Sequence, residues 1–419
     1  MRNGANLYML LVFLFCSANL AWSQTKYTFD VALNVEDELL TVSQTIEYTN
    51  TGDESLDTLY LYDWANSYQG APSPFAKHLA NEFNRSFYIS AKSKLGYTQM
   101  DALKAEDVID WSRVEDQLDI IKVNLLNGLE PGDQIKINLN YVVKIPDDKF
   151  TGVGINSGKG VLLRDLFVTV APRYNDEWLL NSNLGFRDYS SLPSDYSFQW
   201  SYPADYNLLS NLNEISAETS PDDTLNTSLL RDEGVSSAEF VFDLTDSFQT
   251  VEISPNLSIV TNLLPGKNDE VDIESSVRRI DAFTKRILDT LSNKKLLVLR
   301  KDYAKNPIFG VGQLAFLNPF PDEFIYETKF MKAYLASYLN ELFSINKRKD
   351  HWITGGIQTY LMMQYVEEFY PSSKFLGDLY RFKILGIRPF NSYSAANIGF
   401  NESFSFIAEF GEHGNRQQQ

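Results

Sequence analysis

The three histidines of this 419-residue chain are the first candidates for chemistry, because histidine is a common metal ligand and general base. They stand at His78, His351 and His413. A helical zinc motif needs two histidines four residues apart, so that both side chains lie on one helical face. Even the closest two, His351 and His413, are much farther apart than that. The sequence therefore contains no local histidine pair for a metal.

Other catalytic patterns also fail on detail. The glycine-rich stretch 152–160 has Val153 where a phosphate loop needs its first glycine, and Gly160 where it needs a hydroxyl residue. Glu367 and Glu368 are adjacent, so on a helix their side chains diverge by about 100° and cannot face one substrate. No serine has the sequence of a nucleophile elbow. We interpret these stretches as a turn and as solvated surface.

Composition limits the class of protein. The chain has 37 Lys and Arg against 55 Asp and Glu, a formal charge of −18, which argues against a nucleic-acid partner. Its 44% hydrophobic and 14% aromatic content excludes a disordered protein. The length predicts two or three domains at roughly 150 residues each.

Residues 1–23 are predicted to be a signal peptide. Arg2 supplies the positive charge, residues 7–15 are apolar, and Ser23 completes a small-residue cleavage site. The apolar run is shorter than the about 20 residues of a membrane span; an uncleaved anchor or a lipidated Cys16 are the alternatives. We expect an exported protein, periplasmic or extracellular, without disulfides and without a membrane span in its mature part.

The elements that must position any site fall into two groups. Residues 24–263 contain runs of alternating apolar and polar residues, such as 27–35, 40–48 and 134–141, which predict strands with one buried face. Residues 264–419 have apolar residues at helical spacing, with helices predicted over 275–291, 327–343 and 354–369 and a strand over 295–300. The fold class predicted is α+β, a large N-terminal antiparallel β domain followed by an α-rich one.

One segment resembles a known family. His351 to Leu361 is similar to the second zinc-ligand helix of the gluzincin aminopeptidases, the membrane alanyl aminopeptidase family, which has W-L-x-E-G-x-A-x-Y there. Trp352, Ile353, Gly356 and Tyr360 fit that pattern. The resemblance implies that residues 264–419 form a thermolysin-like domain. That domain is expected to be partial, with the protein truncated at its C-terminus, because the family's catalytic tyrosine has no counterpart that we can place.

The resemblance also implies zinc ligands that this sequence lacks. The family binds zinc through HExxH on one helix and a glutamate on the next, and Gly355 takes the place of that glutamate. The usual spacing puts the histidines at Lys332 and Ala336 and the base at Ala333. A loop two residues shorter would instead give Tyr334 and Tyr338, with Leu335 as the base.

The degenerate site residues are therefore predicted to be Tyr334, Leu335, Tyr338 and Gly355, with aromatic rings filling the space left by the metal. Glu341 and His351 are the nearest conventional ligands, but such an isolated pair seldom makes a zinc site. The family's substrate loop carries a glutamate that binds the peptide amine. The corresponding loop here offers only uncharged candidates, Gly310, Gly312 and Gln313.

The sequence is consistent with three functions. We expect an exported aminopeptidase-like protein of a metallopeptidase family that is itself non-catalytic, holds no cofactor and binds peptides or proteins. The first alternative is an active zinc aminopeptidase with displaced ligands, the only case in which zinc is expected. The second is a structural β-rich export protein.

Overall fold

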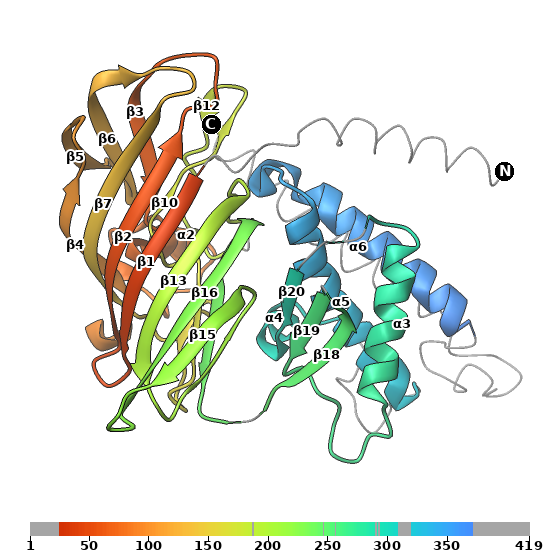
Figure 1. The fold of residues 1–419 in the computed structure, drawn as a ribbon. Helices are drawn as coiled ribbons and strands as arrows, with labels where there is room; N and C mark the ends of the chain where they lie inside the picture. Colours follow the sequence, from red (N-terminus) through yellow and green to blue (C-terminus); the bar gives the residue numbers. More distant parts are fainter. Residues whose placement is uncertain are drawn as a thin grey trace, which may run out of the picture.

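The computed structural model describes residues 25–186, 188–245, 247–255, 257–289, 291, 294–308 and 320–371. The predicted signal peptide, the candidates Gly310, Gly312 and Gln313, and His413 lie outside the described residues. A β-rich N-terminal part is packed beside a smaller part with most of the helices (Figure 1). The predicted α+β class is thereby confirmed.

A seven-stranded sheet forms the outer layer of the N-terminal part, because its strands alternate buried and exposed residues, as β1 does without a break. The pairs are antiparallel except for β1 with β13, which run parallel. This one pair departs from the antiparallel arrangement that the sequence predicts. Its order is β15 (Asn213–Thr219), β16 (Leu225–Val235), β13 (Ser194–Pro203), β1 (Thr25–Asn34), β2 (Leu39–Thr49), β7 (Gln134–Lys144) and β4 (Tyr97–Lys104).

Smaller sheets cover the buried face of the large one, and aromatic side chains fill the space between. Phe29 stacks on Phe198 with ring centroids 4.1 Å apart, and Phe240 of the facing layer meets Phe198 at 4.6 Å. The four-stranded sheets are β10 (Thr169–Val170), β3 (Leu56–Tyr62), β6 (Gln117–Leu129), β5 (Val108–Val114), and β14 (Asn207–Ser210), β17 (Glu239–Asp243), β9 (Val161–Arg164), β8 (Gly154–Ile155). The remaining elements are β11 (Arg173–Tyr174), β12 (Glu177–Trp178), η1 (Trp64–Gln69), α2 (Pro74–Asn81) and η2 (Lys92–Lys94).

Among its described residues, the second part combines a three-stranded sheet with four helices. β18 (Gln249–Ser254) and β19 (Leu257–Thr261) precede residue 264, yet they pair with β20 (Lys294–Val298). The helices are α3 (Ile273–Lys285), α4 (Arg300–Lys305), α5 (Asp322–Leu342) and α6 (Lys347–Phe369).

Helix α6 begins earlier than its sequence pattern predicts. The helical spacing in the sequence predicts a start at residue 354, but the helix begins at Lys347. In the structure the side chain of Asn346 accepts a hydrogen bond from the Lys349 amide, which caps the helix. The polar first turn therefore belongs to the helix. No helix in the described part of the protein is long and apolar enough to cross a membrane.

Candidate functional site

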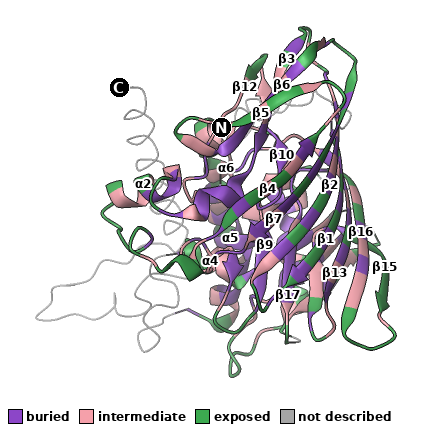
Figure 2. Ribbon diagram, turned by 90° about the vertical axis from the view of Figure 1, so that its left-hand side faces the viewer, coloured by how far each residue is buried: buried purple, intermediate pink, exposed green. Residues whose placement is uncertain are grey.

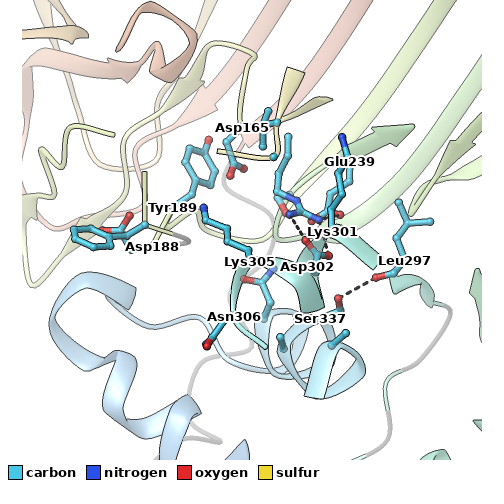
Figure 3. Close-up of a pocket in the computed structure, with 18 of the residues that line it drawn as sticks. Asp165, Asp188, Tyr189, Glu239, Leu297, Lys301, Asp302, Lys305, Asn306 and Ser337 are labelled. Carbon is cyan, nitrogen blue, oxygen red and sulfur yellow. Dashed lines mark hydrogen bonds and ion pairs between the residues drawn. The ribbon is translucent and has the colours of Figure 1, made fainter. Parts of the chain in front are cut away.

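A cavity of about 520 Å³ lies between the two parts of the molecule. The second part contributes β20, α4, α5 and α6. The N-terminal part contributes β9, the residue that follows it, and also Asn183, Gly185, Phe186, Asp188 and Tyr189. Figure 3 shows the charged groups of both parts converging on it. The cavity is therefore built only when the two parts are packed together.

Ion pairs close to the cavity join the two parts. The guanidinium of Arg164, at the end of β9, lies 3.0 Å from Asp302 of α4 and 2.7 Å from Glu239 of β17. Lys301 of α4 pairs with Asp148. Because Arg164 and its two partners are largely buried, these charges satisfy one another rather than water.

Helices α5 and α6 supply the wall where the resemblance places the zinc site. Lys332, Ala333 and Ala336 of α5 line the cavity together with Gly355 of α6. The side chain of Gln358 donates a hydrogen bond of 2.6 Å to the Lys332 carbonyl and fixes the two helices against each other. The structure thus brings the four positions of the usual family spacing to one space.

The positions of the shorter-loop register lie elsewhere. The Tyr334 hydroxyl donates to Asp281 of α3 at 2.9 Å, and the Tyr338 hydroxyl donates to the Asp289 carbonyl at 2.5 Å. Both rings and Leu335 are buried in the core of the second part and do not line the cavity. Residues 332 and 334 are two positions apart on a helix, so their side chains point about 200° apart.

The expectation that aromatic rings fill the space beside Gly355 is therefore wrong. A β-carbon placed on Gly355 would meet no atom within 4 Å. The side chains of Tyr334 and Tyr338 pack toward α3 instead, because that face of α5 is the apolar one. An open space remains where the rings were expected.

The residues of this space do not fit a zinc ion. Lys332, Ala333, Ala336 and Gly355 provide no imidazole, thiolate or carboxylate. Among the described residues no group of three or more His, Cys, Asp or Glu side chains is placed to hold a metal.

His351 and Glu341 both line the cavity, as two of its charged or titratable groups. Burial lowers the pKa of His351, and the hydrogen bond to the Arg348 backbone and the charges of Asp188 and Asp350 oppose that effect. His78 lies on α2, where its ring meets Phe186 at 4.9 Å. The structure therefore brings only one of the two described histidines to the cavity.

The cavity is rich in bases for so acidic a protein. Burial also lowers the pKa of Lys295. Most of the charged residues that line the cavity were not predicted from the sequence, because they come from distant strands and helices and carry no local motif. Six basic residues (Arg164, Lys295, Lys301, Lys305, Lys332, Lys347) and five acidic ones (Asp165, Asp188, Glu239, Asp302, Glu341) line it.

Comparison with known proteins gives a likeness of structure only. No family model matches the sequence, and neither does any curated protein. An M1 zinc metallopeptidase from Deinococcus radiodurans is similar at 13% identity and a TM-score of 0.48, covering 83% of this chain and 71% of that one. A mutant two-domain M1 zinc metallopeptidase bound to L-tryptophan gives 13% identity and a TM-score of 0.49, with 84% and 72% covered.

Proposed function

We propose that this is a non-catalytic protein that binds a peptide or a segment of a protein in the cavity between its two parts. One observation carries the proposal: Lys332, Ala333, Ala336 and Gly355 face a common open space and offer neither a metal ligand nor a base of the HExxH kind. At these four positions the cavity therefore lacks the metal ligands and the general base that zinc-dependent hydrolysis requires.

The shape and charge of the cavity favour a peptide. Its volume of about 520 Å³ is within the range of small-ligand sites. Its lining includes side chains of both signs and leucines from β20 (Leu296 and Leu297). A peptide has two charged ends, polar amides and apolar side chains, so it can contact the basic, the acidic and the apolar parts of this lining.

Metal content and hydrolysis separate this proposal from an active enzyme with displaced ligands. We expect purified protein to contain far less than one zinc per molecule by elemental analysis. It should release no N-terminal residue from aminoacyl amides above a buffer control, with or without added zinc. A stoichiometric zinc together with hydrolysis that a chelator abolishes would overturn the proposal.

Two neighbouring glycines give a matched test of binding. Gly355 lines the cavity, whereas Gly356 is exposed on a different side of α6, and a β-carbon meets no atom within 4 Å at either position. Gly355→Phe should block retention of peptides from a random tetrapeptide library, read by mass spectrometry, and Gly356→Phe should not. A purely structural protein would retain no peptide in any form.

We also propose that residues 1–23 direct export and are removed. The support is the apolar run at 7–15 followed by small residues. Amino-terminal sequencing of protein recovered outside the cytoplasm should begin at Gln24. A protein that keeps its first residues would contradict this.

A further inference from the structure

The loop after α2 exposes several large apolar side chains. Phe83 is 96% exposed, Tyr88 55% and Ile89 77%. Of the eleven large apolar side chains that the described residues expose, these three fall within seven consecutive positions. Figure 2 shows α2 and the largely exposed loop beside it at the margin of the molecule. This clustering calls for a partner, because scattered exposed residues are ordinary but grouped ones are not.

Phe83 stands where folding alone would favour glycine. Its φ is +60°, and its amide donates to the Ala80 carbonyl at 3.1 Å while the Asn84 amide donates to Leu79 at 2.8 Å. This geometry ends helix α2 with a left-handed residue, a position that glycine occupies without steric cost. The phenylalanine side chain gains no packing in return, since it is almost wholly exposed.

The loop is nevertheless held in place. Phe87, between the exposed residues, is fully buried, and its ring meets those of Phe75 and Phe150 at 4.7 and 4.8 Å. The Ile89 amide donates to the Arg85 carbonyl at 3.1 Å. The exposed side chains therefore project from an anchored turn rather than from an unsupported one.

The charge of this loop is opposite to that of the whole protein. Residues 82–95 contain three bases and one acid, Glu82. Lys94 is paired with Asp147 at 2.8 Å, whereas Arg85 and Lys92 are exposed. In a protein with a formal charge of −18, this is a surface that an anionic partner can approach.

We propose that this loop is a membrane-docking tip: Phe83, Tyr88 and Ile89 insert between the headgroups of an anionic lipid surface, and Arg85 and Lys92 contact the lipid phosphates. Apolar and aromatic side chains flanked by bases are the composition of interfacial anchors. Three side chains expose a few hundred Å² at most, too little for a stable protein interface of about 1,000 Å² or more. A lipid surface requires no such area.

Vesicle cosedimentation tests the proposal on the protein that begins at Gln24. Vesicles of phosphatidylcholine with about one-third phosphatidylglycerol should bind it, and vesicles of phosphatidylcholine alone should bind it less, because the bases then lose their partner. Added salt should weaken binding to the anionic vesicles. Phe83→Gly and Ile89→Ser should each lower the partition coefficient about tenfold.

A measurement of melting temperature and a control variant distinguish a loss of membrane binding from misfolding. Phe83→Gly relieves a left-handed phenylalanine, so its melting temperature should equal or exceed that of the parent. The control is Ile109→Ser, which removes a 61% exposed isoleucine from β5 and should leave the partition coefficient within about twofold. Absence of vesicle binding by the parent protein would overturn the proposal, as would equal losses for Ile109→Ser and Ile89→Ser. Self-association that Phe83→Gly abolishes, without vesicle binding, would indicate a protein partner instead and overturn it too.

Discussion

Gly355 and Gly185 differ in the space around their α-carbons, and this difference predicts opposite effects of alanine. Gly355 is inside helix α6 with nothing within 4 Å of an added β-carbon, so Gly355→Ala should raise the free energy of unfolding by about 1 kcal/mol. Gly185 has φ +84° and would place a β-carbon 2.6 Å from the Phe75 ring. Gly185→Ala should therefore lower it by more than about 1 kcal/mol. Urea titration of both variants measures these changes; equal effects would contradict the assignment of open space at Gly355.

Asp119 should give stability an unusual dependence on pH. Burial raises its pKa to about 6, with the charge of Asp63 as a smaller cause, while the amide of Asn183 works in the other direction. The folded state therefore binds this proton more tightly than the unfolded state, and the associated stability is lost as pH rises from about 4 to about 6. This difference in pKa between the folded and the unfolded state corresponds to roughly 3 kcal/mol in the free energy of unfolding. Asp119→Asn should be the more stable protein at pH 7.5 but not at pH 4, as measured by urea titration; identical pH profiles would contradict this.

At the scale of elements, helices α3, α5 and α6 meet on one buried carboxylate. Glu327 of α5 accepts hydrogen bonds from Arg279 of α3 and from the hydroxyls of Tyr365 and Tyr370, at 2.5 and 2.6 Å for the tyrosines. Arg279→Met leaves that carboxylate buried without its cation, and should cost about 3–5 kcal/mol in urea unfolding. The double variant Arg279→Met/Glu327→Leu should recover most of the loss. A single variant as stable as the parent would show that the tyrosines suffice.

At the scale of the whole molecule, Arg348 ties the two parts together beside the cavity. This α6 residue pairs with the buried Asp188 and donates to the Ser182 carbonyl at 2.7 Å. Arg348→Ala should weaken the interface, so that the two parts unfold in separate calorimetric transitions at different temperatures. Arg348→Ala/Asp188→Ala should restore part of the coupling, because no charge is then left buried. A single unchanged transition in Arg348→Ala would show that the other ion pairs are sufficient.

The spacing of apolar residues in the sequence was sufficient to predict much of the local structure. The alternation over residues 27–35 and 40–48 became β1 and β2, and the helical spacing over 327–343 became most of α5. The start of α6 was missed because its cap, Asn346, resembles ordinary loop chemistry in the sequence. The parallel pairing of β1 with β13 was also missed, since pairing between strands that far apart in the sequence leaves no local pattern.

By itself the sequence determined that the three histidines of the protein are too far apart for a helical zinc motif, and that its two parts differ in periodicity. These are properties of composition and spacing, which folding cannot alter. Only the tertiary structure decided which face of α5 meets the cavity: it placed Lys332 and Ala336 beside open space and turned Tyr334 and Tyr338 into the core. The physical reason is that a helix offers several faces, and the packing of α3 and β20 against it selects the apolar one for burial.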